Sequence, residues 1–118
     1  MHEFSIAMNI VEIAETEAKA VNSTHITNIE LDVGTMAGIE FYALDTALEM
    51  AVKNTLLDGA TIKVNKIQAC ARCTNCNNEF DMNNITDSCP KCNGLFSDVI
   101  SGKELKIKSI VVEEGESV

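Results

Sequence analysis

Two cysteine pairs constrain the fold of this chain more than any other feature of its sequence. Cys73 and Cys76 form one Cys-x2-Cys pair, Cys89 and Cys92 form a second, and twelve residues separate the two. Two such hairpins brought face to face place four thiolates at the corners of a tetrahedron, which is the closed geometry of a structural zinc site. The spacing therefore predicts a metal-held module. It indicates little about activity, because a saturated thiolate site has no open position for a substrate.

A fifth cysteine makes the register of the first pair ambiguous, because Cys70, Cys73 and Cys76 repeat at the same interval. Thiolate hairpins of this kind usually turn through a left-handed residue just after the second cysteine. Asn77 follows Cys76 and tolerates that conformation, whereas Thr74 follows Cys73 and is β-branched. We therefore predict zinc on Cys73, Cys76, Cys89 and Cys92, with Cys70 a spare thiol. The alternatives are a role for Cys70 as a regulatory or alternate ligand, and iron in place of zinc.

Composition limits the classes of function. The chain has 118 residues, of which 46% are hydrophobic, so it is long enough for one ordinary core with a small module attached. Its formal charge of −9 repels phosphate backbones, and the basic stripe typical of nucleic-acid binders is missing. We expect no nucleic-acid partner.

The cysteine usage and the amino-terminal segment predict the compartment. Cys-x2-Cys spacing is typical of metal binding in a reducing environment rather than of a secreted disulfide framework. The sequence has no basic segment followed by an apolar run at its start, and no stretch long enough to span a bilayer. We expect a cytoplasmic protein without a membrane partner.

Hydrophobic periodicity predicts an α/β fold. The expected elements are a helix over 5–21 capped by Ser5, a turn at 22–25, a strand over 28–33, a loop over 34–38, a helix over 39–53 with Phe41, Leu44, Leu48 and Ala51 inward, a turn at Asp58 and Gly59, a strand from 62, and a last strand over 104–113. Three strands under two helices make a two-layer core. We therefore assign 1–68 plus 103–118 to an α/β domain and 69–102 to an inserted zinc-ribbon-like module with two Cys-x2-Cys knuckles.

The apolar phase slips by one residue in two of the expected strands. Ile107 is followed by Ile110, and Val64 is followed by Ile67. A slip of one residue turns the following side chains to the opposite face, so each break predicts a bulge or a strong twist.

The module has few residues with which to build a core. The candidates are Phe80, Met82, Ile85, Leu95, Phe96 and Val99. So small a core does not offset the entropy of ordering some thirty residues, and bound metal must supply the difference.

The amino terminus is a second candidate metal site. Aminopeptidases remove Met only before small residues, so Met1 should stay in front of His2. The free amine, one peptide nitrogen and the His2 imidazole can then close two fused chelate rings, and the Glu3 amide or a carboxylate completes a four-coordinate set. Nitrogen-rich square-planar sets suit Ni(II) or Cu(II) rather than zinc. The alternative is a frayed terminus with an incidental histidine.

Glu40, at the start of the second expected helix, has two candidate roles. It can complement the positive end of the helix dipole, or it can supply a carboxylate to the terminal site if that helix begins beside the amino terminus. His25 lies in a turn, and we give it no role.

The whole chain resembles the HypA/HybF family of nickel chaperones for [NiFe]-hydrogenase maturation. The residues that carry the resemblance are Met1-His2-Glu3 before an amphipathic helix, Gly34 after the first strand, the cysteine quartet with Cys89-Pro90-Lys91-Cys92, and the segment from Gly102 to Ile107. The resemblance implies that His2 is the essential nickel ligand, helped by Met1 and Glu3. It implies that Glu40 matches a loop carboxylate that contributes in some members.

The resemblance also implies the partners. The family acts with a nickel-binding maturation GTPase and delivers Ni(II) to the apo large subunit of [NiFe]-hydrogenase. We therefore expect a carrier with transferable nickel and structural zinc, not an enzyme; no Ser-His-Asp set or phosphate-binding glycine loop is visible. The rival class is a zinc-ribbon adapter that binds protein or nucleic acid. Service to urease and formation of a homodimer are left open.

Overall fold

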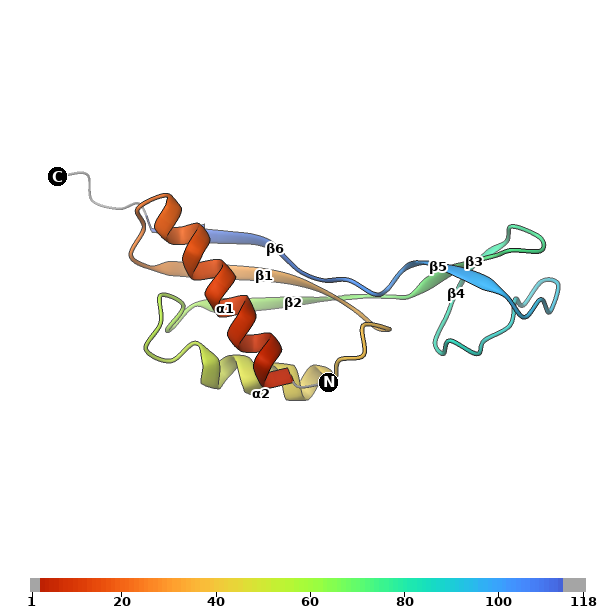
Figure 1. The fold of residues 1–118 in the computed structure, drawn as a ribbon, viewed down its shortest axis with the longest axis horizontal. Coiled ribbons are helices and arrows are strands. Elements are labelled where there is room, and N and C mark those ends of the chain that lie inside the picture. Colours follow the sequence, from red (N-terminus) through yellow and green to blue (C-terminus); the bar gives the residue numbers. More distant parts are fainter. Residues whose placement is uncertain (1–2, 114–118) are drawn as a thin grey trace. The chain divides into compact units, whose positions relative to one another are not determined.

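The computed structural model describes residues 3–113 as two helices and six strands. In chain order these are α1 (Glu3–Ala20), β1 (Ile26–Gly34), α2 (Phe41–Ala51), β2 (Thr61–Ile67), β3 (Cys70–Cys73), β4 (Glu79–Asp81), β5 (Ser97–Ser101) and β6 (Leu105–Val112). The order of helices and strands is the predicted one, with the cysteine module between β2 and β6 (Figure 1).

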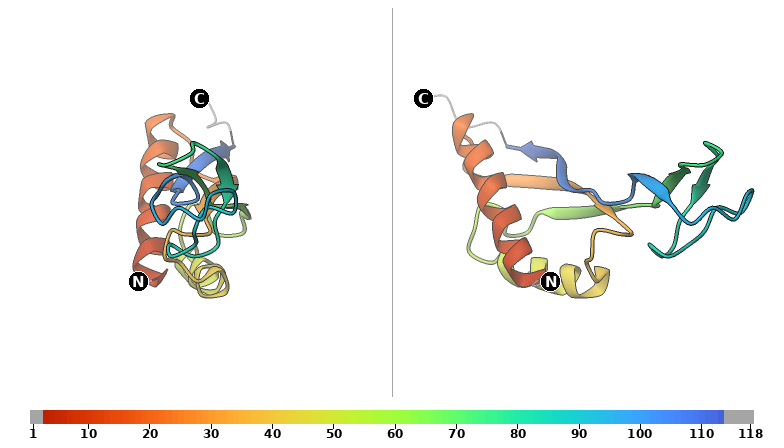
Figure 2. Two further views of the ribbon diagram at one scale, coloured as in Figure 1. Left: turned by 90° about the vertical axis from the view of Figure 1, so that its right-hand side faces the viewer. Right: turned by 45° about the vertical axis from the view of Figure 1, so that its right-hand side comes forward.

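The first sheet has the strand order β2-β1-β6 and carries both helices (Figures 1 and 2). The central strand β1 alternates in burial, with Ile29, Leu31 and Val33 inside as predicted. The helices bury small and branched side chains against the sheet and against each other: Ala7, Ile10, Val11, Ala14 and Ala18 from α1, and Leu44, Ala47, Leu48 and Ala51 from α2. The two-layer α/β prediction is confirmed.

Two predicted helix boundaries are wrong. Ser5 does not cap the first helix, because α1 already begins at Glu3, whose carboxylate is favourable at the positive end of a helix dipole. The second helix is shorter than 39–53, because Glu40 has an extended backbone (φ −85°, ψ 118°) and Val52 is the residue that ends it. Phe41, predicted to face inward, is only half-buried.

The predicted phase slips appear in the burial pattern. In β6 the exposed pair Lys108 and Ser109 stands between Ile107 and Ile110, and in β2 both Val64 and Asn65 are half-buried. The bulges themselves stay a prediction for these two strands.

The second sheet has the order β4-β3-β5, and both pairings are antiparallel. Its core is small: Ala69, Ala71 and Met82 are buried, and Phe80 and Val99 pack on them. The prediction that Ile85, Leu95 and Phe96 are buried is wrong, because all three are exposed. Leu95 and Phe96 follow the second cysteine turn, where the Thr74 N–H donates to the Phe96 carbonyl. Ile85 lies in a turn held by the Asp87 carboxylate, which accepts the N–H groups of Asn83 and Asn84. Their exposure leaves the module even more dependent on metal.

The chain divides into two compact units. The first consists of three segments, which are the chain up to Leu31, Ile39–Val64, and the chain from Ile107. The second consists of Asp32–Gly38 and Asn65–Lys106. In the second unit the backbones of Gly34 and Gly102 lie so close that a methyl group on Gly34 would overlap the Gly102 carbonyl.

Of the helices in residues 3–113, neither combines the length and the apolar composition needed to cross a bilayer.

Candidate metal centre

The structure brings the four predicted sulfur atoms together. The Sγ atoms of Cys73, Cys76, Cys89 and Cys92 lie within 4.8 Å of one another. Sγ of Cys73 is 3.5 Å from that of Cys92, and Sγ of Cys76 is 3.7 Å from that of Cys89. A zinc ion with Zn–S bonds of ~2.3 Å needs a tetrahedron with edges of about 3.8 Å. The arrangement therefore fits a tetrahedral thiolate-bound ion.

Two matching turns hold the sulfurs. Asn77 and Asn93, which follow Cys76 and Cys92, have left-handed backbones with φ of 61° and 58°. The Asn77 N–H donates to the Cys73 carbonyl at 3.0 Å, and the Asn93 N–H donates to the Cys89 carbonyl at 2.8 Å. The register chosen from backbone sterics is thus the one that the structure adopts.

Cys70 lies apart from this cluster. It is half-buried in β3, where its Cα is paired with Asp81 of β4 and Ser101 of β5. The strand register shifts between Cys70 and Ala71, so the irregularity in this sheet falls at the spare cysteine.

Three further residues shape the sulfur cluster, and the sequence analysis did not identify them. The Asn75 N–H lies 3.4 Å from Sγ of Cys73, and its amide nitrogen lies 3.6 Å from Sγ of Cys92. The amide of Asn78 reaches Sγ of Cys89 at 3.7 Å. Gly94 leaves room for the sulfur atoms, because a methyl there would lie 3.2 Å from Sγ of Cys73 and of Cys92. The Asn residues within and directly after the cysteine pairs were the signal in the sequence that pointed to these contacts.

The thiols differ in acidity. Burial acts to raise the pKa of Cys89, but the N–H groups of Cys92 and Lys91 and the Asn78 amide outweigh it and lower the pKa to about 6. The Asn75 amide and the Gly94 N–H lower the pKa of Cys92. For Cys76 the Asn78 N–H acts to lower the pKa, yet burial and the neighbouring sulfurs raise it to about 11. The cluster thus favours thiolates at some positions and a retained proton at another until a cation neutralises them.

The second candidate site is described only in part. Met1 and His2 lie outside the described residues. Glu3 and Glu40, 37 positions apart, are linked: the Glu40 N–H donates to Oε2 of Glu3 at 3.3 Å. The Glu40 carboxylate accepts the N–H groups of Tyr42 at 3.2 Å and Ala43 at 2.6 Å, so it caps α2. Helix α2 therefore begins beside the residue that follows His2.

The two sites differ in enclosure. Cys73 and Cys89 are buried and the other two cysteines of the cluster are half-buried, which suits an ion that is held permanently. Glu3 is half-buried and Glu40 exposed, so water and a partner's ligands can approach. Four thiolates select a soft or borderline cation, whereas carboxylates beside nitrogen donors suit an exchangeable divalent ion.

Comparisons with a family model and with individual proteins point to the same family. The family model for hydrogenase and urease nickel incorporation, the HypA metallochaperone, matches residues 1–112. The hydrogenase maturation factor HypA of Parabacteroides distasonis is 36% identical over 114 residues, covering 97% of this chain and 99% of the relative. That of Chlorobium limicola is 37% identical over 116 residues, covering 98% and 100%.

Solved structures are similar in fold. The solution structure of the Ni metallochaperone HypA from Helicobacter pylori superposes with a TM-score of 0.67 at 20% identity, covering 95% of this chain and 97% of that one. A second solution structure, of HypA protein, gives 0.71 at 19% identity, covering 97% and 98%. At such identities the likeness supports the fold.

Proposed function

The chain belongs to the HypA family of metallochaperones for nickel incorporation in hydrogenase maturation, and on that premise we propose that it loads one Ni(II) at its amino terminus and delivers it to the apo large subunit of [NiFe]-hydrogenase. We assign the nickel ligands to Met1, His2, Glu3 and Glu40. The observation that carries the assignment is the hydrogen bond from the Glu40 N–H to Oε2 of Glu3. This hydrogen bond holds Glu3, which follows His2 in the chain, at the start of α2.

The proposed amino-terminal donor atoms explain why nickel is bound reversibly. The Met1 amine, a peptide nitrogen and the His2 imidazole form a nitrogen-rich set that suits Ni(II). Coordination requires the peptide nitrogen to lose its proton, so affinity rises with pH. Protonation of His2, or competition from the acceptor's ligands, then releases the ion. A carboxylate has about four lone-pair positions, so the two capping bonds of Glu40 leave capacity for a cation.

The sulfur cluster has a structural task in this account. We assign zinc to Cys73, Cys76, Cys89 and Cys92, because the sulfur separations fit a closed tetrahedral site and such sites contribute directly to folding. Residues 1–68 with 103–118 are then the nickel-binding domain, and 69–102 the zinc module. The zinc ion holds this module together and takes no part in a reaction.

The proposed partners follow from the same role. A nickel-binding maturation GTPase and the hydrogenase large subunit act with this chain in the cytoplasm. With a net charge of −9 and no basic stripe, the chain has no electrostatic basis for binding nucleic acid. We propose that it is a carrier and not an enzyme.

A matched pair of histidine variants tests the proposal. We expect His2→Gln, which keeps a large residue after Met1 and so keeps Met1 in place, to abolish nickel binding in calorimetric titrations of untagged protein while zinc content and folding stay normal. His25→Gln, which removes the chain's other histidine, should bind nickel like the parent. Normal nickel affinity in His2→Gln would defeat the assignment. A residue added before Met1 should also impair binding, because it removes the amine from the chelate.

A further inference from the structure

An apolar groove lies between the start of α1 and the outer side of α2. It has a volume of about 390 Å³, Glu3 lies in its lining, and Phe4, Tyr42, Thr46 and Met50 line the rest of its length. Tyr42 is 78% exposed and Met50 59%, so neither side chain contributes to the core. We call this feature the α1–α2 groove.

The groove results from a second stripe on α2. Tyr42, Thr46 and Met50 recur every four residues and so share one face of the helix, whereas Leu44 and Leu48 face the core. On α1, Phe4 and Met8 repeat at the same interval, and both are exposed. A helix that needs only its inner face for folding has no structural use for a second apolar face, and exposed apolar patches mark binding surfaces. Methionines suit such a surface because their side chains adapt to the occupant.

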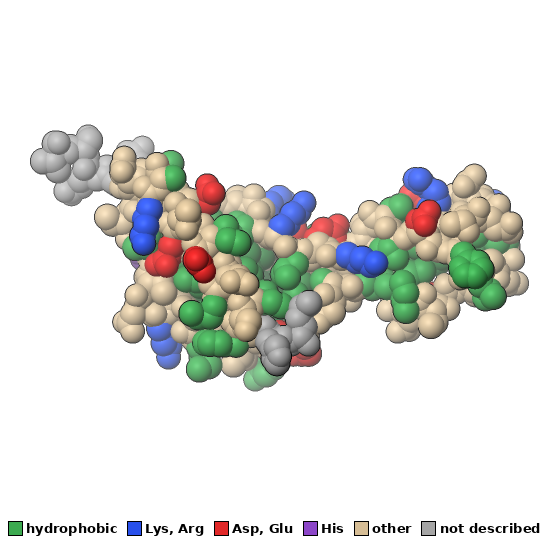
Figure 3. Space-filling view, viewed as in Figure 1, with side chains coloured by type: hydrophobic (Ala, Val, Ile, Leu, Met, Phe, Trp, Pro, Cys, Tyr) green, Lys and Arg blue, Asp and Glu red, His purple; other side chains and the backbone are tan. Residues whose placement is uncertain are grey.

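The charged residue that lines the groove is acidic. Glu3 lies in the lining, and Glu40 caps α2, which itself carries no Lys or Arg. Asp45 and Glu49 of α2 line a separate hollow with Leu48 and Ile62, so they add negative charge from the flank of the helix. On the face seen in Figure 3, exposed hydrophobic side chains lie over the helices together with acidic ones, and basic side chains also appear toward the end of α1. An occupant with apolar side chains flanked by Lys or Arg would match both the apolar lining and the carboxylates.

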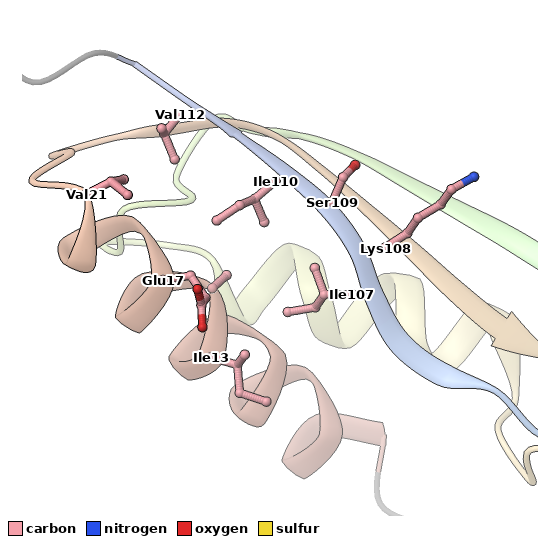
Figure 4. A pocket seen from close by; sticks show the side chains of 9 residues that line it. Ile13, Glu17, Val21, Ile107, Lys108, Ser109, Ile110 and Val112 are labelled. Atoms are coloured by element: carbon pink, nitrogen blue, oxygen red, sulfur yellow. The ribbon is translucent and has the colours of Figure 1, made fainter.

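A second groove of about 530 Å³ lacks this combination. It lies between α1 and β6, and its lining includes Ile13, Ile110 and the oppositely charged Glu17 and Lys108 (Figure 4). Mixed charges select no particular sign of partner. This groove therefore serves as a control surface, and Ile13, 54% exposed on the same helix as Phe4, as a control position.

We propose that the α1–α2 groove docks the nickel acceptor, through a segment of the apo large subunit that presents apolar side chains between basic ones. This inference rests on the proposed delivery function. The acceptor's ligands must come within bonding distance of the ion, so the docking surface continuous with the nickel-binding terminus belongs to the acceptor. Glu3 joins the two, because it lines the groove, contacts Glu40 and follows His2 in the chain.

Binding of the apo large subunit to full-length, untagged, nickel-loaded protein tests this inference. We expect Met50→Glu, which places a charge in the groove and suits a helix, to weaken the complex by at least about tenfold, as truncation of a central interface residue does. The matched variant Ile13→Glu should stay within about twofold of the parent, because isolated surface changes have small effects. Both variants should still bind one nickel. Glu49→Lys should weaken the complex less, and more at low salt than at high salt.

Each other outcome has a distinct meaning. If the parent chain fails to bind the large subunit, the delivery function fails and the inference with it. If the parent binds and Met50→Glu binds equally well, or Ile13→Glu loses as much, the groove is not the docking site although delivery stands. If Met50→Glu impairs binding of the maturation GTPase and leaves the large subunit unaffected, the groove belongs to the GTPase and the inference is overturned.

Discussion

The two metal-site regions of this molecule are built in opposite ways. The sulfur cluster takes all its ligands from two local turns, repeats the same N–H to carbonyl bond in each, and buries Cys73 and Cys89. In the amino-terminal region the Glu40 N–H donates to Glu3 from a distant segment, with Glu3 half-buried and Glu40 exposed. The contrast supports the proposal that the sulfur cluster, enclosed by short-range backbone bonds, retains its ion and that the proposed amino-terminal site releases its ion.

The largest expected effect comes from removing a sulfur. We expect Cys89→Ala to release the zinc and unfold the second unit, because structural zinc contributes roughly 10–16 kcal/mol of apparent binding free energy in small modules and the apolar core here is only Ala69, Ala71 and Met82 with partly buried neighbours. Amide hydrogen exchange should show loss of protection in the module and retained protection in α1 and α2. Cys70→Ala is the control and should keep its metal. Retention of zinc by Cys89→Ala would show that the cluster is not a four-sulfur site.

A methyl group beside the sulfurs should have the next largest effect. In Gly94→Ala the added carbon meets Sγ of Cys73 and of Cys92 at 3.2 Å, closer than ordinary van der Waals contact. We expect zinc transfer to a chelator to become about 10–100-fold more favourable, the range seen when groups supporting metal ligands are changed. An unchanged chelator competition curve would mean that the turn relaxes without disturbing the sulfurs.

Acidification should separate the two sites. Protons compete with metal for both ligand sets, so affinity falls as pH falls. The nickel set depends on an imidazole, whose ordinary pKa is about 6.5, and on a peptide nitrogen that must lose its proton, whereas four thiolates enclose zinc in a closed site, so nickel should leave before zinc.

Before metal binds, the Cys89 thiol shifts the folding equilibrium of the module with the same sign. Its pKa is depressed in the fold, so its contribution to stability is present above the ordinary thiol pKa and is lost as pH falls through about 6. Cys76 has the opposite effect, because its pKa is raised in the fold. Its contribution to the stability of the fold is present at lower pH and is lost as the pH rises through about 11.

Metal content measured across pH 8 to pH 5 tests the order in which the two metals are released. Loss of zinc before nickel would contradict the prediction.

The smallest expected effect concerns the helix cap. Glu40→Ala removes the acceptor for the N–H groups of Tyr42 and Ala43 and should destabilise the protein by about 1 kcal/mol in urea unfolding. Glu40→Gln keeps an oxygen for the cap but removes the charge. If Glu40 is a nickel ligand, Glu40→Gln should weaken nickel binding while stability changes little. Equal nickel affinity in the parent and in Glu40→Gln would restrict Glu40 to capping.

The features that were predictable from sequence are those set by local chemistry. The cysteine register followed from the tolerance of Asn77 and Asn93 for a left-handed backbone, and the structure has both in that conformation. The inner face of β1 followed from strict alternation of apolar residues. Both depend on a few neighbouring residues and on sterics that hold in any fold.

The features that were missed depend on tertiary context. Leu95 and Phe96 have core-type side chains, yet the backbone around the sulfur cluster leaves them exposed. The roles of Asn75, Asn78 and Gly94 depend on where sulfur atoms from the other turn lie. The link between Glu3 and Glu40 joins segments 37 residues apart, so the sequence could offer it only as a condition on where the second helix begins.

Native mass spectrometry of the intact, untagged protein tests the central claim most directly. With zinc and excess nickel supplied, the account predicts a species carrying one zinc and one nickel, and a His2→Gln variant carrying zinc alone. A parent protein that holds only the sulfur-bound ion at every nickel concentration would contradict it.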